Sequence, residues 1–343
     1  MRRLWLHTVR AYLRLGLFFY FKKIDVRRVD SIPKYEAVLF LGNHQNALLD
    51  ALLIAAKNDR FSYFLTRASV FSKPIISNIL KSLLMLPVYR IRDGWANLTK
   101  NNSVFSESSK LLSKKEAIVI FPEGSHNLKR TVRPLSKGFT RIIFETLEQY
   151  PNAKINLIPV GLNFANATQF GDSTLVNFGK VIEINTSILN DKNKGVSDLK
   201  ALVFDELCQL TTHIESEHYD TKLKALKNLN VDFTKPERVN ACLKSNFVTC
   251  ESRPVNTHGV FKVFSKFLLI CCLIVPYVIW KKVVKPKIKE VEFISTFRFA
   301  MAITLVPIFL LIVFVLLSTI FQFQIGALYL IFVIVLVLLA VKL

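Results

Sequence analysis

The sequence predicts an α/β fold, in which a central, mostly parallel sheet is flanked by helices. Segments with strand-like and helix-like patterns alternate along the first half of the chain, which is typical of this class. The strand-like segments are short, almost uninterrupted apolar runs, as expected of parallel strands buried on both faces. We expect the α/β domain at residues 24–190, an N-terminal amphipathic helix at 1–23, a helical insert at 191–258 and a membrane tail at 259–343.

The elements of the domain follow from apolar runs and from helical spacing. Strands are predicted at 36–42, 60–66, 86–89, 117–121 and 155–161, and the domain is expected to end around 181–184. Helices are predicted at 47–56, 74–84, 95–113 and 138–147. The run AIVIF at 117–121 is the clearest strand, because branched apolar residues favour extended structure.

A regular apolar spacing predicts an amphipathic helix beyond the sheet. Apolar side chains recur at intervals of four, four, three and four residues, at Leu199, Val203, Leu207, Leu210 and Ile214. The surrounding stretch is polar, so we expect a helical insert between the α/β domain and the membrane tail. No residue of the insert is expected to take part in chemistry, and its His213 and His218 are expected to be solvated.

The composition favours a protein at a membrane surface. The chain has 343 residues, of which 51% are hydrophobic, and a net charge of +21. A chain this apolar can bury a core, which excludes a disordered protein. The excess positive charge lies at the two ends, beside the apolar runs, and this pairing favours a phospholipid bilayer as partner. Soluble nucleic-acid-binding proteins are less apolar, so no nucleic acid partner is expected.

Two uncharged segments near the C-terminus predict a transmembrane hairpin. As helices, residues 300–321 would be about 33 Å long and residues 325–341 about 26 Å long, against a hydrocarbon core of about 30 Å. A third apolar run, 267–280, would be only about 21 Å long and contains Pro276. We expect this third run to form a re-entrant or interfacial helix rather than a full crossing.

A group of lysines predicts the orientation of the tail. The third apolar run is followed by Lys281, Lys282, Lys285, Lys287 and Lys289. Loops rich in Lys and Arg tend to stay in the cytoplasm. We therefore expect an integral protein of the cytoplasmic (inner) membrane, with its catalytic domain on the cytoplasmic face.

The N-terminal residues have the pattern of an interfacial membrane-anchor helix. One helical face carries Arg3, His7, Arg10 and Arg14, and apolar residues lie largely elsewhere on the helix. A secretory signal is the alternative. Its apolar core, 15–21, would be only seven residues long and lacks a small-residue cleavage site, so a retained anchor is favoured.

The cysteines give no sign of a disulfide framework or a zinc site. There are five of them, an odd number, and they show no Cys-x-x-Cys or Cys/His ligand spacing. We therefore expect free thiols, no metal, and a reducing cytoplasmic environment for the polar part of the chain.

Short polar clusters follow the predicted strand ends, which is where open α/β sheets place their sites. The cluster at 43–50 contains His44 and Asp50, and the cluster at 122–127 contains Glu123. A third cluster, at 87–94, contains two arginines. We expect the three clusters to meet at one edge of the sheet.

These clusters resemble, in order and spacing, the four motifs of the glycerolphosphate/lysophosphatidate acyltransferase family. The matching segments are Asn-His…Asp at 43–50, the arginine-bearing segment at 87–94, Phe-Pro-Glu-Gly at 121–124 and Ile-Pro-Val at 158–160. The resemblance covers about residues 30–185. It implies an acyltransferase-like α/β fold and a role in phospholipid biosynthesis, in which an acyl group moves from acyl-CoA or acyl-carrier protein to a hydroxyl.

The resemblance also implies the roles of two catalytic residues. A hydroxyl is hardly ionised at neutral pH, so a base must take its proton, and the imidazole of His44 suits this task. Asp50 would hold the other ring nitrogen and stabilise the imidazolium. The family transfers the acyl group directly, so neither a covalent nucleophile nor a cofactor beyond the acyl carrier is expected.

The resemblance further implies a set of acceptor-binding residues. This set comprises Arg90, Arg92, Glu123, Gly124, Ser125 and His126. The two arginines would bind the phosphate of the acceptor, because a guanidinium can form two parallel hydrogen bonds with it.

Two features depart from the usual family pattern. Five residues instead of four separate His44 from Asp50, which would place the side chains about 120° apart on a continuous helix. His44 must therefore lie in the loop before the helix, with Asp50 in its first turns. His126 occupies the place of the family's usual arginine, and Arg130 or Arg133 could take over as the phosphate ligand.

Both departures resemble the fungal-type glycerol-3-phosphate/dihydroxyacetone-phosphate acyltransferases. This favours glycerol 3-phosphate as the acceptor, with lysophosphatidate or another lyso-lipid as the alternative. An alternative of another class is a non-enzymatic lipid-binding membrane protein.

Overall fold

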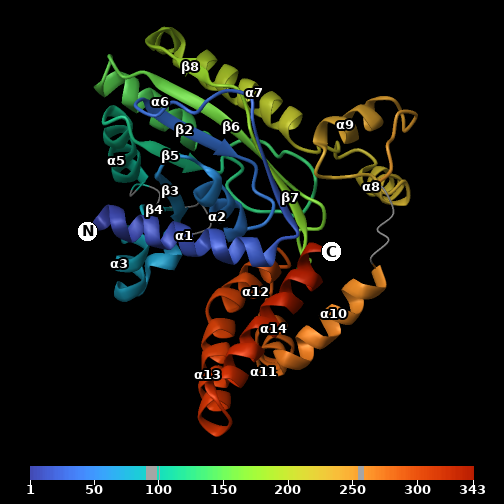
Figure 1. Cartoon of the computed structure of the whole chain (residues 1–343). Helices are drawn as coiled ribbons and strands as arrows, with labels where there is room; N and C mark the ends of the chain where they lie inside the picture. Colours follow the sequence, from blue (N-terminus) through green and yellow to red (C-terminus); the bar gives the residue numbers. More distant parts are fainter. Residues whose placement is uncertain (90–98, 100, 254–258) are drawn as a thin grey trace.

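The architecture is organised around one eight-stranded sheet, which Figure 1 shows in a computed structural model that describes residues 1–89, 99, 101–253 and 259–343. The strands are β1 (Lys23–Arg28), β2 (Ala37–Gly42), β3 (Ser62–Arg67), β4 (Met85–Val88), β5 (Ala117–Ile120), β6 (Ile155–Phe164), β7 (Ser173–Phe178) and β8 (Ile182–Ile184). Their order is β1-β7-β6-β2-β5-β3-β4, and β8 also pairs with β6. The five strands from β6 to β4 are parallel, whereas β7 and β8 are antiparallel to β6. The predicted mostly parallel sheet is therefore confirmed.

Three strands of the sheet were not predicted, namely β1, β7 and the short β8. β1 is a polar segment (KIDVRR) at the edge of the sheet, where it pairs only with β7. β7 pairs with both β1 and β6 and lies beyond the last long apolar run. An edge strand needs no continuous apolar run, because only one of its sides is paired and its residues remain partly exposed.

Helices cover both faces of the sheet, and alternate residues of each strand point to opposite faces. In β2, Val38 and Phe40 pack in the core with α1 (Arg2–Tyr20), α2 (Leu48–Lys57) and α12 (Phe293–Ile303). Leu39 and Leu41 face the other core, with α5 (Asn101–Ser113), α6 (Gly138–Gln149) and α7 (Lys192–Leu210). Because α7 shares the sheet's own core, the helix predicted in the insert packs on the α/β domain. Smaller helices at the edge are η1 (Ala68–Phe71), α3 (Pro74–Ser82) and η3 (Thr186–Asp191).

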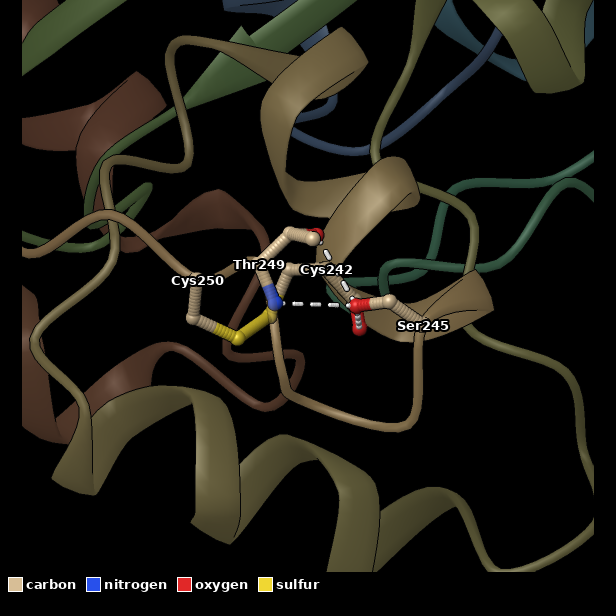
Figure 2. Close-up of a disulfide and its surroundings, with 4 residues drawn as sticks. All are labelled: Cys242, Ser245, Thr249 and Cys250. Atoms are coloured by element: carbon tan, nitrogen blue, oxygen red, sulfur yellow. Dashed lines mark hydrogen bonds between the residues drawn. A yellow bond between two sulfur atoms is a disulfide. The ribbon is translucent and has the colours of Figure 1, made fainter.

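A small lobe with its own core follows α7. It contains α8 (Tyr219–Asn228) and α9 (Pro236–Lys244), which pack around Ile214, Val231 and Phe233. A disulfide joins Cys242 and Cys250 at the end of α9 (Figure 2). The expectation of free thiols was therefore wrong for this pair. The physical reason is local: Asn246 and Phe247 adopt positive φ and fold the chain back, which neither cysteine count nor ligand spacing reveals.

The N-terminal helix α1 is amphipathic, and two arginines of its basic face bond to the α/β domain while the face as a whole remains partly exposed. The Arg10 Nη2 donates to the carbonyl of Arg60 at 2.6 Å, and the Arg14 Nε donates to the carbonyl of Ala56 at 2.7 Å. The ring of His7 packs edge-on against Phe61. Large apolar side chains on the outer side are also exposed, namely Leu4, Trp5, Tyr12, Leu15 and Phe18.

The C-terminal helices gather on one side of the α/β domain (orange to red in Figure 1). They are α10 (Gly259–Cys272), α11 (Ile274–Val278), η4 (Ile279–Val284), η5 (Lys285–Lys287), α12, α13 (Leu305–Ile320) and α14 (Phe323–Lys342). Within the described residues, two helices are long and apolar enough to cross a membrane, Phe293–Ile320 and Phe323–Lys342. The predicted third run lies in a helix pair that bends by 97° near Leu273, so it is not a straight span.

A close contact between β6 and α7 yields a stability prediction. A Cβ atom on Gly161 would lie 2.3 Å from the backbone oxygen of Leu210, and a backbone atom cannot rotate away. We expect Gly161→Ala to lower the free energy of unfolding by about 1–3 kcal/mol. Thermal unfolding of the detergent-solubilised chain measures this. The control is Gly138→Ala, where the nearest atom would be the Ser136 Oγ at 3.8 Å; an equal loss in both variants would contradict the packing argument.

Candidate active site

The site begins where β2 leaves the sheet. The side chain of Asn43 bonds to both backbone groups of Leu162 in β6: its Nδ2 donates to the carbonyl at 3.1 Å, and its Oδ1 accepts from the amide at 2.7 Å. The amide side chain thus continues the β2–β6 ladder by one step. This fixes the point at which the chain turns away from the sheet and presents His44.

A loop brings His44 and Asp50 together despite their unusual spacing. His44 lies before α2, and Ala47, with φ at 46°, turns the chain into the helix. Asp50 lies in the first turn of α2 and is fully buried. Its Oδ2 lies 2.8 Å from the Nδ1 of His44 and accepts from the amide of Asn46 at 2.7 Å. The prediction that His44 lies in the loop and Asp50 in the first turn is confirmed.

This contact determines what the imidazole can do. An aspartate oxygen accepts, so the Nδ1 of His44 carries the proton and the Nε2 is left to act as a base. The ring stacks on Phe121, with centroids 4.2 Å apart and planes 15° apart, and the side chain is 12% exposed. The imidazole is therefore held in one orientation at the edge of solvent.

Glu123 lies beside His44, on the turn that follows β5. Gly124 has a φ of +73°, a backbone conformation that suits glycine, and it closes the turn by donating to the carbonyl of Phe121. The Glu123 Oε1 accepts from the amide of His44 at 3.4 Å. The amide of Asn127 donates to the carbonyl of His44 at 3.0 Å. The clusters at 43–50 and 122–127 therefore meet, as the sequence predicts.

Arg133 completes this corner of the site. Its Nε donates to the Glu123 Oε2 at 2.6 Å, and its Nη1 donates to the Ser125 Oγ at 2.7 Å. Burial raises the pKa of Glu123 to about 7, and the neighbouring Arg133 guanidinium opposes that shift. Arg130, the other arginine left open by the sequence, is partly buried and donates to the carbonyls of Phe164 and Ala165 instead. Of the two, Arg133 is therefore the one beside Glu123.

His126 has a partner that the sequence did not suggest. Its Nε2 lies 2.7 Å from the Glu290 Oε2, in the loop before α12. Its ring centroid lies 5.6 Å from that of His44. The two residues of this contact are 164 positions apart, and no spacing or motif in the sequence connects them.

The predicted phosphate-binding residues Arg90 and Arg92 lie outside the described residues. Only the start of their segment is placed, where β4 ends at Val88.

One group among the described residues has a geometry that could hold a metal ion. Ligand atoms of His126, Glu290 and Glu292 lie within 4.8 Å of one another. The His126 imidazole and the Glu290 carboxylate already satisfy each other by a hydrogen bond. We assign no metal to this group.

A small polar pocket, open to solvent, adjoins His44 and Glu123. It is lined by the loop after β2, the 127–132 segment, β6 and the residues that follow α7. The Oγ1 of Thr212 faces the inside of the protein without a hydrogen-bond partner among the described residues.

Comparisons with known proteins place the site in a family context. The family model described as Acyltransferase matches residues 23–163. An uncharacterized acyltransferase of Schizosaccharomyces pombe is 24% identical over 148 residues, which is 40% of this chain and 22% of that protein. Glycerol-3-phosphate O-acyltransferase 1 of Saccharomyces cerevisiae is 29% identical over 73 residues, which is 21% of this chain and 10% of that protein. The chain thus spans less than a quarter of the length of either relative.

A solved structure is also similar. The crystal structure of the 1-acyl-sn-glycerophosphate (LPA) acyltransferase PlsC from Thermotoga maritima aligns with a TM-score of 0.43 and 16% identity. The alignment covers 60% of this chain and 80% of that one. The family model described as Acyltransferase thus matches the segment that holds His44, Asp50 and Glu123, in agreement with the sequence motifs.

Proposed function

We propose that this chain is a membrane-bound O-acyltransferase of phospholipid biosynthesis. It transfers a fatty acyl group from acyl-CoA or acyl-carrier protein to the hydroxyl of glycerol 3-phosphate. The observation that supports this most directly is the 2.8 Å contact between the His44 Nδ1 and the Asp50 Oδ2, at the carboxyl end of β2. It leaves the Nε2 ready to accept a proton next to the turn that carries Glu123.

The proposed reaction needs one base and no covalent intermediate. The Nε2 of His44 takes the proton of the acceptor hydroxyl as the oxygen attacks the thioester carbonyl. Asp50 stabilises the imidazolium that forms. When the tetrahedral intermediate collapses, the carbon–sulfur bond breaks, and the imidazolium returns its proton to the leaving thiolate. The products are the acylated acceptor and the free thiol carrier.

The acceptor assignment rests on charge and on one relative. Arg133 places a guanidinium beside Glu123 and Ser125, where the family resemblance expects acceptor binding. Arg90 and Arg92 are proposed to add further positive charge. The relative from Saccharomyces cerevisiae is named a glycerol-3-phosphate acyltransferase, which supports glycerol 3-phosphate over lysophosphatidate.

A bilayer partner is supported by the outward-facing apolar surfaces. The outer face of α1 is apolar, and α3 exposes Ile75, Ile76 and Ile79 with lysines at positions 73 and 81. The indole of Trp5 donates to the Ser82 Oγ and joins these two helices. Together with the two candidate spans of the tail, these surfaces suit contact with lipid.

We place the α/β domain on the cytoplasmic face of the inner membrane because the lysines of 281–289 lie at the base of the tail. On that side the Cys242–Cys250 pair would meet a reducing environment. Alkylation of thiols in intact cells tests on which side of the membrane the domain lies. Reduced thiols at Cys242 and Cys250 support a cytoplasmic location, and a persistent disulfide argues against it.

The decisive experiment is an acceptor comparison. The purified full-length chain receives labelled acyl-CoA or acyl-carrier protein with glycerol 3-phosphate, lysophosphatidate or an amino-acid lyso-lipid. We expect the fastest transfer to glycerol 3-phosphate. Faster transfer to a lyso-lipid would reassign the acceptor. No transfer to any acceptor, with membrane association intact, would favour a lipid-binding protein without catalysis.

Removing the base should nearly abolish transfer. We expect His44→Ala to lower kcat by about 10²–10⁴, the usual contribution of a general base. Asp50→Asn should lower kcat by about 10–10³, because an amide no longer fixes the imidazole tautomer or stabilises the imidazolium. His218→Ala is the control, since its side chain is 74% exposed. If His44→Ala keeps wild-type turnover, the proposed mechanism is wrong.

The raised pKa of Glu123 predicts a pH dependence of acceptor binding. Above pH 7 the carboxylate neutralises Arg133; below pH 7 Glu123 takes up a proton while the guanidinium keeps its charge. The KM for glycerol 3-phosphate should therefore fall by about three- to tenfold from pH 8 to 6.5. Glu123→Gln should give a low KM at every pH in this range. The control is Glu217→Gln, because the Glu217 side chain is 82% exposed. This variant should keep the wild-type dependence of KM on pH.

A further inference from the structure

The membrane tail reaches into the candidate active site. Glu290 lies in the loop between η5 and α12, and its Oε2 is 2.7 Å from the His126 Nε2. Phe293, the first residue of α12, packs edge-on against the other side of the same imidazole, with centroids 4.7 Å apart. The tail therefore contacts His126 through a charged group and through an aromatic ring.

These contacts belong to a continuous row of rings. Phe121 stacks on His44, His44 meets His126 edge-on at 5.6 Å, and His126 meets Phe293. The row runs from the end of β5 to the start of α12. The side chain of His126 is only 10% exposed, whereas that of Glu290 is 53% exposed. The imidazole is therefore enclosed by its neighbours, and the carboxylate closes it from the solvent side.

A second set of bonds fixes α12 to the loop that carries His44. The Ser295 Oγ donates to the carbonyl of Ala167 at 2.6 Å, and the Asn46 Nδ2 donates to the same carbonyl at 2.9 Å. Asn46 is also the residue whose amide binds Asp50. The Arg298 Nη1 adds a bond to the carbonyl of Thr168 at 3.0 Å. The start of α12 and the His44 loop thus share one anchoring point in the α/β domain.

We propose that Glu290 is a positioning residue, which holds His126 against His44 and makes the membrane tail one wall of the acceptor site. This inference rests on the proposed function. A carboxylate bonded to one ring nitrogen of a histidine fixes both its orientation and its tautomer. Without Glu290 the His126 ring would be free to rotate away from the site.

Loss of the Glu290 carboxylate should weaken binding of the acceptor and leave binding of the acyl donor unchanged. We expect Glu290→Ala to raise the KM for the acceptor about tenfold, the scale of one charge-assisted hydrogen bond, and to leave the KM for the acyl donor unchanged. Glu290→Gln keeps an oxygen that can accept from the imidazole and should recover most of the affinity. The matched control is Glu292→Ala in the same loop, which should behave as wild type. A metal site would instead make both glutamates necessary.

A double-mutant cycle tests whether Glu290 acts through His126. In a chain that carries His126→Ala, adding Glu290→Ala should change the acceptor KM less than twofold, because the group it positions is gone. An additive tenfold loss would overturn the proposal. So would a Glu290→Ala variant with the wild-type acceptor KM.

A crosslink tests the contact without reference to activity. The full-length chain with Cys208, Cys271 and Cys272 changed to serine receives His126→Cys and Glu290→Cys, and is treated in membranes with a short thiol-specific bifunctional crosslinker, because a direct disulfide would need closer backbones than this side-chain contact requires. We expect a peptide pair linked through positions 126 and 290 by mass spectrometry. Absence of this link overturns the contact whatever the activity. If the link forms but the chain without the two added cysteines transfers no acyl group to any acceptor, the contact stands and only the proposed function is overturned.

Discussion

The site depends on one buried carboxylate. The Oδ2 of Asp50 accepts hydrogen bonds from the His44 Nδ1 and the Asn46 amide. Because Asp50 is fully buried, these two donors replace the water that would otherwise solvate its carboxylate. A buried carboxylate without such partners would be costly, so the loop between β2 and α2 must close around it. The same two bonds set the start of α2, the orientation of the imidazole and the nitrogen that carries the proton. The positive N-terminus of α2 further favours the negative charge.

The sequence predicted those parts of the fold that local patterns determine. The five parallel strands are apolar runs that the core requires, and each has its counterpart among the predicted segments. The meeting of His44, Asp50 and Glu123 was predictable as well, because the carboxyl ends of neighbouring parallel strands share one edge. β1 escaped prediction because its residues are polar, and its place depends on pairing with the distant β7.

The rest depends on contacts that no local pattern encodes. Helical periodicity gives two faces for α1, but it does not reveal that Arg10 and Arg14 bond to the carbonyls of Arg60 and Ala56 in the α/β domain. Arg130 and Arg133 are equivalent in the sequence, but in the fold Arg130 donates to main-chain carbonyls and Arg133 pairs with Glu123. Tertiary contacts therefore determine the partners of these side chains, and residue spacing along the sequence does not predict them.

The tail joins the candidate site to two candidate membrane spans, and the proposed reaction gives that link a physical purpose. The acylated product carries a long apolar chain, and moving that chain through water costs about 0.8 kcal/mol for each exposed CH₂ group. From Phe293, which contacts His126, to residue 300, where the uncharged run begins, the helical rise is only about 10 Å. With that run in the bilayer, the imidazole lies close to the lipid surface. In the proposed reaction, a site so placed releases its product directly into lipid, because the first candidate span begins beside the candidate site.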